Sequence, residues 1–123
     1  LAAIFNGVAE IIAEFRPDVA AVETVFMSRN PQAAIKLGQA RGAAICAAVQ
    51  AGLEVHEYAP RLIKQAIVGR GGADKRQIQH MVRALLRTDL PFGADAADAL
   101  AVALCHHHSH QTAARLPPGV VLR

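Results

Sequence analysis

A short apolar run at residues 19–22 (VAAV) is the feature that most constrains how this chain folds. A continuous run of this length is typical of a strand that is covered on both faces. Pro17 ends the helical pattern before it, because the residue that precedes a proline avoids the helical conformation. Glu23 stands at the carboxyl end of the run, and in parallel sheets that edge is where ligands bind. We therefore predict an α/β domain in which a strand over residues 18–23 presents Glu23 at its end.

Helical periodicity and boundary residues define the other elements. We expect helices over residues 2–15, 31–50 and 60–68, from 75 onward, and over about 94–110, with a second, edge strand over 54–58. Asn30 is the expected N-cap of the second helix, with Pro31 at its first position. Asp74 and Gln77 match a capping box at the start of the fourth helix, and Gly69 ends the third.

Two aspartates interrupt the Ala- and Leu-rich helix that begins near residue 94. Asp95 and Asp98 are three residues apart and share one face of that helix. Val102, four residues after Asp98, lies on the same face and is apolar. We expect Asp98 to be buried, and buried carboxylates are costly unless a partner neutralises them. Together with Glu23 they form a plausible oxygen-only cation site. The alternative is that both aspartates cap the helix and interact with its dipole.

Positive charge is concentrated in residues 61–87, where seven Lys and Arg side chains face a single acid, Asp74. A segregated basic segment indicates a polyanionic partner such as nucleic acid, although a solvated basic face is the alternative. Lys75 and Arg76 lie in the first turn of the fourth helix, where free backbone N–H groups also favour anions. Cations at that end oppose the helix dipole, which favours a phosphate contact over a structural role.

Three further features leave a structural and a functional interpretation open. Phe26, in the loop after Glu23, can stack on an unpaired base or pack over the next helix. Ala34, Gly38 and Gly42 recur every four residues, which suits either tight packing on the sheet or a contact between subunits. The histidines in residues 106–110 are interpreted as a polar terminal turn rather than a zinc site, because consecutive helical residues cannot all face one metal.

Length and composition restrict the class of protein. The 123 residues, 53% of them hydrophobic, suffice for one domain and argue against disorder. Two isolated cysteines, Cys46 and Cys105, suit reduced thiols in the cytoplasm, and no apolar run reaches the length of a membrane span. The chain starts at Leu1 inside a helical pattern, so we expect a fragment that lacks its natural start. Residues 1–110 are expected to form the domain and residues 111–123 a flexible basic tail.

Five stretches resemble the bacterial RuvC family of Holliday junction resolvases over nearly the whole chain. They are 21–26 (AVETVF), 36–42 (KLGQARG), 64–65 (KQ), 79–82 (QHMV) and 94–101 (ADAADALA). The second and the last are the most specific. The resemblance implies a ribonuclease H-like α/β fold, with a mixed five-stranded sheet flanked by helices, of which the first three strands are absent here.

The resemblance also implies a function and a set of site residues. The family nicks four-way DNA junctions symmetrically in recombination and repair, with four acidic positions that bind magnesium. Glu23, Asp95 and Asp98 match three of them, and two magnesium ions per subunit are expected, with manganese able to substitute.

Further residues and partners follow from the same resemblance. Phe26 matches a residue that helps to hold the junction open, and Lys64 and Lys75 match basic residues near the cleaved strand. The expected partners are a four-way DNA junction, a second copy in a homodimer, and the RuvA–RuvB branch-migration complex.

One part of the family pattern is missing from this sequence. The first catalytic aspartate of the family lies in a Gly-Ile-Asp-Pro-Gly stretch, which does not occur here. We therefore expect residues 1–123 alone to fold poorly and not to cleave junctions, and an N-terminal segment with that stretch to restore both properties. The competing interpretation is a non-catalytic module that binds junctions and dimerises.

Overall fold

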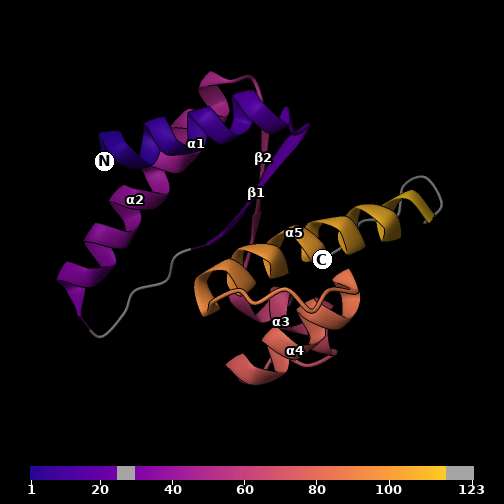
Figure 1. The fold of residues 1–123 in the computed structure, drawn as a ribbon. Coiled ribbons are helices and arrows are strands. Elements are labelled where there is room, and N and C mark those ends of the chain that lie inside the picture. The colour runs from indigo at the N-terminus through magenta and orange to yellow at the C-terminus, as the bar shows by residue number, and fades with distance from the viewer. Residues whose placement is uncertain (25–29, 116–123) are drawn as a thin grey trace. The chain divides into compact units, whose positions relative to one another are not determined.

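The computed structural model describes residues 1–24 and 30–115, and it divides into two units, Leu1–Glu57 and Tyr58–Arg123 (Figure 1). The first unit contains α1 (Ala2–Phe15), β1 (Val19–Glu23), α2 (Pro31–Gln50) and most of β2 (Glu54–Tyr58). The second contains α3 (Pro60–Val68), α4 (Lys75–Leu86) and α5 (Ala94–Arg115). Each unit is described by itself below.

In the first unit, β1 and β2 pair in a two-stranded parallel sheet, with α2 as the connection between them. A helical crossover is the usual connection between parallel strands. Asn30 caps α2 as expected, since its side-chain oxygen accepts hydrogen bonds from the backbone N–H groups of Gln32 and Ala33. Arg16 ends α1 in the left-handed conformation, with φ of 49°, and donates its N–H to the carbonyl of Ile12.

The prediction that β1 is covered on both faces is wrong for this chain. Its residues 19–22 are only half-buried, and the buried side chains among the described residues of this unit are Ala47 and Ala48 of α2. Alanines reach too short a distance to fill the space beside α1, and a cavity of about 480 Å³ lies there, lined mainly by apolar side chains. The apolar stripe of α1 is likewise split, because Val8 and Ile12 are half-buried whereas Ile11 and Phe15 are exposed.

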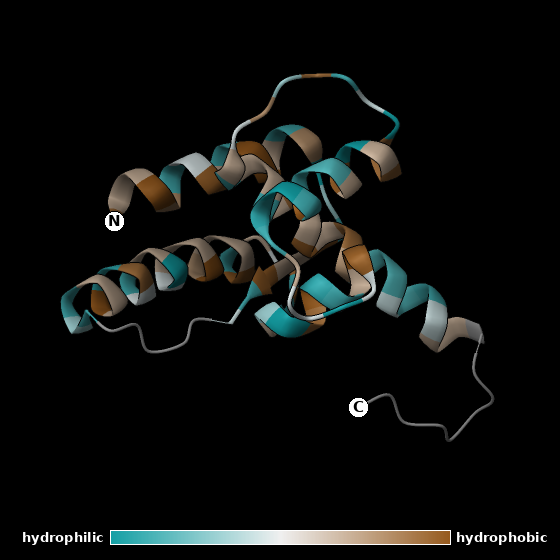
Figure 2. Ribbon diagram, turned by 90° about the horizontal axis from the view of Figure 1, so that it is seen from below, coloured by the Kyte–Doolittle hydropathy of each residue, from teal (hydrophilic) through white to brown (hydrophobic). Residues whose placement is uncertain are grey.

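The second unit packs three helices against one another, and its core is larger. Figure 2 shows hydrophobic and hydrophilic residues in alternating bands along the helices, as amphipathic packing requires. Val82 of α4 and Cys105 of α5 are fully buried. The other buried side chains here are those of Ile63, Ile67, Ala73, Ile78, Ala97, Ala101 and Val102.

The ends of these helices agree with the boundaries predicted from the sequence, except at the end of α5. The capping box of Asp74 and Gln77 forms at the start of α4, and Gly69 ends α3 with φ of 79°. However, α5 does not stop at the histidines but continues to Arg115, so the prediction of a loose tail from residue 111 is wrong for residues 111–115. These five residues include two alanines, a glutamine and an arginine, which are good helix formers. No helix among the described residues is both long and apolar enough to cross a membrane.

Candidate functional site

Glu23 is the last residue of β1, as the sequence predicts, and its side chain is exposed. Its backbone is tied to α2, because Nε of Arg41 donates a hydrogen bond to the carbonyl oxygen of Glu23 over 3.1 Å. The same guanidinium forms an ion pair with Glu57 of β2, with 2.7 Å between Nη2 and Oε1. Arg41 therefore joins α2 to the ends of both strands. The sequence analysis missed it, although it lies within the family-like stretch 36–42.

Asp95 and Asp98 lie in the first two turns of α5, and both are exposed. The expected burial of Asp98 is wrong, although Val102 on the same face is buried. At this end of α5 the buried side of the helix is the one that carries Ala97, which is fully buried. Adjacent helical residues point about 100° apart, so Asp98 points away from that side. Both aspartates thus present carboxylate oxygens to solvent near the positive end of the helix dipole.

The three candidate metal ligands come from two different units. Glu23 belongs to the first, whereas Asp95 and Asp98 belong to the second. Within residues 1–24 and 30–115, no group of three or more His, Cys, Asp or Glu side chains forms a site that could hold a metal ion. The joint site of Glu23, Asp95 and Asp98 therefore stays a prediction. The donor chemistry fits a hard divalent cation, since all three offer exposed carboxylate oxygens.

The segment that leads into α5 is anchored by an arginine of α4. Nη2 of Arg83 donates a hydrogen bond to the carbonyl oxygen of Phe92 over 3.2 Å, and its guanidinium carbon lies 4.4 Å from the centroid of the Phe92 ring. A cation over an aromatic face is attracted by the ring quadrupole. Phe92 precedes Asp95 by three residues, so this contact fixes the chain just before the two aspartates.

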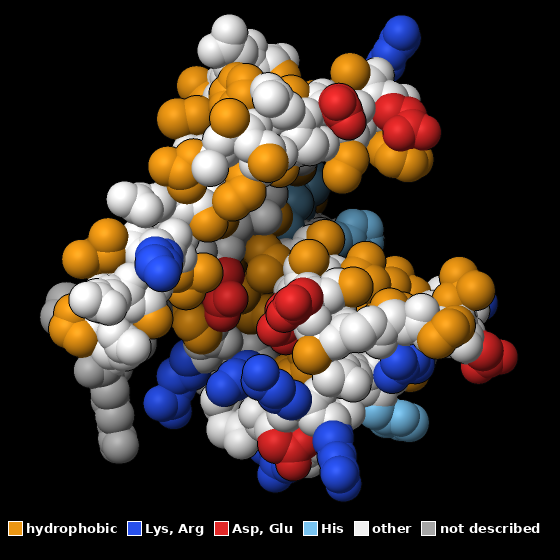
Figure 3. All heavy atoms as spheres, turned by 60° about the vertical axis from the view of Figure 1, so that its left-hand side comes forward, with side chains coloured by type: hydrophobic (Ala, Val, Ile, Leu, Met, Phe, Trp, Pro, Cys, Tyr) orange, Lys and Arg blue, Asp and Glu red, His pale blue; other side chains and the backbone are white. Residues whose placement is uncertain are grey.

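Basic residues gather on α3 and α4, as the charge pattern indicates. Lys64 of α3 is half-buried, whereas Lys75 and Arg76 at the start of α4 are exposed. Figure 3 shows several Lys and Arg side chains close together on the second unit. Gly71 in the connecting loop approaches Arg61 so closely that an added Cβ would lie 2.6 Å from its Cγ. The loop between α3 and α4 therefore packs against the side chain of Arg61, near the start of α3.

A cavity of about 360 Å³ lies between α3 and α4. Its lining combines an arginine, an amide and an imidazole with apolar side chains, namely Ile67, Val68, Arg70, Gln77, His80 and Met81. The sequence analysis missed this cavity, because its lining residues come from two helices and the loop between them and carry no local motif.

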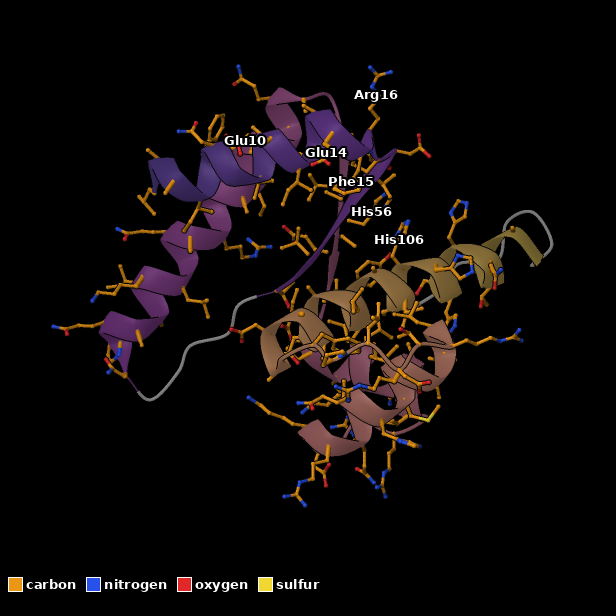
Figure 4. The ribbon with its side chains drawn as sticks, viewed as in Figure 1. Glu10, Glu14, Phe15, Arg16, His56 and His106 are labelled. Atoms are coloured by element: carbon orange, nitrogen blue, oxygen red, sulfur yellow. The ribbon has the colours of Figure 1, made fainter. Side chains whose placement is uncertain are left out.

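Two of the clustered histidines attach α5 to neighbouring segments. The hydroxyl of Tyr58 and Nδ1 of His106 share a hydrogen bond of 2.5 Å, and His106 projects from α5 as labelled in Figure 4. Nδ1 of His108 donates a hydrogen bond to the carbonyl oxygen of Ala66 over 3.3 Å. The interpretation of residues 106–110 as a polar terminal turn is therefore wrong, since the helix continues and these side chains hold it in place.

Burial also affects two ionisable groups beside these histidines. It raises the pKa of the Tyr58 phenol, with a smaller contribution in the same direction from Cys105. Burial likewise raises the pKa of the Cys105 thiol, which a hydrogen bond with Ser109 partly offsets. Both groups therefore stay protonated at neutral pH and contribute to packing.

Phe26 and its loop, residues 25–29, lie outside the described residues. Neither base stacking nor packing over α2 is therefore tested for Phe26, and both stay predictions.

Comparison with known proteins places the chain in a family. The family model described as crossover junction endodeoxyribonuclease RuvC matches residues 1–106. The RuvC of Tolumonas auensis is 60% identical over 113 residues, which cover 92% of this chain and 65% of that protein. The RuvC of Marinobacter nauticus is 59% identical over 116 residues, covering 94% of this chain and 66% of that protein. The chain thus spans just under two thirds of the length of these curated relatives.

Solved structures give the same result for the fold. The Thermus thermophilus RuvC structure superposes with a TM-score of 0.82 at 39% identity, over 91% of this chain and 68% of that one. The same protein in complex with a Holliday junction substrate gives a TM-score of 0.85 at 39% identity, with the same coverage. These matches confirm the expected ribonuclease H-like α/β fold. From its motifs, its fold and the match over residues 1–106, the chain belongs to the RuvC family of crossover junction endodeoxyribonucleases.

Proposed function

We propose that the protein carrying this chain is a structure-selective endonuclease that resolves Holliday junctions by paired, symmetric nicks. The observation that carries the proposal is the family match over residues 1–106, which includes Glu23, Asp95 and Asp98. The related Thermus thermophilus protein, solved with a Holliday junction substrate, supports the choice of DNA. The activity serves homologous recombination and DNA repair.

The proposed chemistry is phosphodiester hydrolysis assisted by magnesium. Glu23 at the end of β1 and the aspartates of α5 supply hard oxygen ligands, which suit this ion. Two magnesium ions, when bound, supply an activated water and stabilise the leaving oxygen, and manganese substitutes for them. All three carboxylates are exposed, so a cation held by them would be accessible to a phosphate of the DNA backbone.

The remaining residues bind and orient the junction. Lys64, Lys75 and Arg76 lower the electrostatic cost of bringing phosphates next to carboxylates, because each cation neutralises a backbone charge. Phe26 stacks on an exposed base at the junction centre. A four-way junction has two equivalent strands, so a homodimer matches it with two symmetric sites. The RuvA–RuvB complex recruits the enzyme to junctions in the cytoplasm.

The test uses the protein as its gene encodes it and a synthetic four-way junction labelled on each strand. We expect two nicks at symmetric positions that depend on magnesium and yield ligatable duplexes. A linear duplex of the same sequence is the matched control and should stay intact. Binding without nicking would instead assign the protein as a junction-binding module, and cleavage of both substrates at equal rates would overturn the proposal.

A further inference from the structure

Arg41 makes two contacts that meet at the carboxyl end of β1. Its Nε donates to the carbonyl oxygen of Glu23, and its Nη2 pairs with the carboxylate of Glu57. The side chain of Arg41 is 24% exposed, whereas that of Glu57 is 53% exposed. The guanidinium is thus largely covered. Two of its nitrogens each have an acceptor, one on β1 and the other on β2.

The bond to the carbonyl of Glu23 constrains the backbone position from which the Glu23 side chain extends. A carbonyl oxygen lies in the peptide plane that starts at its own Cα, so holding the oxygen holds the orientation of that plane. The hydrogen bond also holds the Glu23 Cα, which carries the side chain, in place against α2. Glu23 is also the last residue of β1, where the ladder no longer restrains the chain beyond it. A contact from α2 at this point therefore positions the backbone that carries the Glu23 carboxylate.

Glu57 has a separate part in this arrangement. The guanidinium of Arg41 reaches the Glu23 carbonyl through Nε, and its Nη2 reaches Glu57. Glu57 directs the guanidinium through a charge-assisted hydrogen bond, which is about twice as strong as a neutral one. Its negative charge also offsets the charge of Arg41. Glu57 thereby fixes the direction of the guanidinium that holds the Glu23 carbonyl.

We propose that Arg41 is a positioning residue for Glu23 and that Glu57 holds Arg41 in place. The inference rests on the proposed function, in which Glu23 is a metal ligand. The geometry requires arginine, because a lysine ammonium is a point charge and cannot direct two nitrogens of one plane at two fixed acceptors. A lysine at position 41 would therefore keep the positive charge but not both contacts of Arg41.

The first experiment measures nicking of a four-way junction against magnesium concentration for the parent, Arg41→Lys and Glu57→Gln. We expect Arg41→Lys to lower the maximal rate by roughly tenfold to a hundredfold, the usual effect of losing a group that orients a metal ligand. Glu57→Gln should raise the half-saturating magnesium concentration, because the guanidinium that holds the Glu23 carbonyl loses its charged partner. Junction affinity without metal should stay within about twofold of the parent, since neither residue is proposed to contact the DNA.

A matched control is Lys36→Gln, which removes an exposed cation from the same helix. It should leave the maximal rate and the magnesium dependence unchanged. Parent-like rates and magnesium dependence in Arg41→Lys would overturn the proposal. So would a loss of junction affinity with unchanged magnesium dependence, which would make Arg41 a DNA contact.

A second readout does not depend on activity. Amide hydrogen exchange in a peptide that covers residues 19–24 should be faster in Arg41→Lys than in the parent or in Lys36→Gln. Equal hydrogen-exchange rates in all three proteins would overturn the proposal, even if their nicking rates differ. If the parent itself does not nick junctions, the proposed function fails, and the exchange data still decide whether Arg41 restrains the end of β1.

Discussion

The guanidinium of Arg83 binds Phe92 in two ways, through a 3.2 Å hydrogen bond to the backbone carbonyl and a 4.4 Å approach to the ring centroid. The contact joins α4 to the segment that precedes α5. It parallels the contact of Arg41 with Glu23 in the first unit, since in each case an arginine of a helix holds a backbone carbonyl at or near a predicted metal ligand.

We predict that Arg83→Lys destabilises the protein by about 1–2 kcal/mol, because it loses the hydrogen bond and weakens the cation–π contact. Phe92→Leu keeps the carbonyl acceptor and should therefore cost less than Arg83→Lys. Thermal unfolding of the two variants and of the double variant measures their coupling. Strictly additive effects would show that Arg83 and Phe92 do not stabilise each other.

Asp98→Asn should abolish nicking while junction binding is retained. The change removes a negatively charged oxygen ligand and preserves the shape of the side chain. A rate loss on the order of a hundredfold or more is expected, since groups that merely orient metal ligands already contribute roughly 10- to 100-fold. Asp95→Asn should behave similarly, and Asp89→Asn, in the turn before α5, is the control. Near-parental nicking by Asp98→Asn in magnesium would remove Asp98 from the metal site.

Lys75→Ala should weaken junction binding in a salt-dependent manner. Each phosphate contact contributes about one unit to the slope of log affinity against log salt concentration, so the slope should fall by about one. Lys36→Ala, outside the basic segment, should leave the slope unchanged. Titrations at several salt concentrations measure the difference. An unchanged slope for Lys75→Ala would assign Lys75 to a solvated face.

The two cysteines should differ strongly in reactivity towards a thiol reagent. Cys46 is exposed, whereas Cys105 is buried and its pKa is raised by that burial. A raised pKa leaves less thiolate at pH 8, so Cys105 should react far more slowly. In Cys46→Ser, the remaining labelling rate should keep increasing as the pH rises past 9. Rapid labelling of Cys105 at pH 8 would show that α5 separates readily from α3.

The stability of the folded protein should decrease at alkaline pH. The pKa values of Tyr58 and Cys105 are raised in the folded protein, so the unfolded chain loses these protons at lower pH. Both groups thus favour folding below their unfolded pKa values, and that contribution is lost as the pH rises through the folded values. Chemical unfolding at several alkaline pH values measures this loss of stability.

Local chemistry in the sequence predicted most element boundaries. Pro17, Pro31 and Pro60 restrict the backbone wherever they occur, and Asp74 and Gln77 satisfy each other's backbone groups within one turn. These effects involve neighbours in the chain, so they need no tertiary contact. The carboxyl end of β1 at Glu23 and the helical pair Asp95 and Asp98 were predictable for the same reason.

Tertiary contacts decided the features that the sequence analysis missed or mistook. Asp98 is exposed because the side of α5 that is covered at its start is that of Ala97, and helical periodicity alone does not reveal which side a neighbour covers. The extension of α5 to Arg115 accompanies a bond between His108 and Ala66, which lie far apart in the chain.

The two arginine contacts depend on the fold in the same way, since Arg41 is 18 residues from Glu23 and Arg83 is nine from Phe92. The sequence by itself determined the helices, the strands and the family-like acidic residues, because these depend on local conformation and residue chemistry. The tertiary structure alone decided which side chains hold the backbone near those acids, because such contacts join segments that only packing brings together.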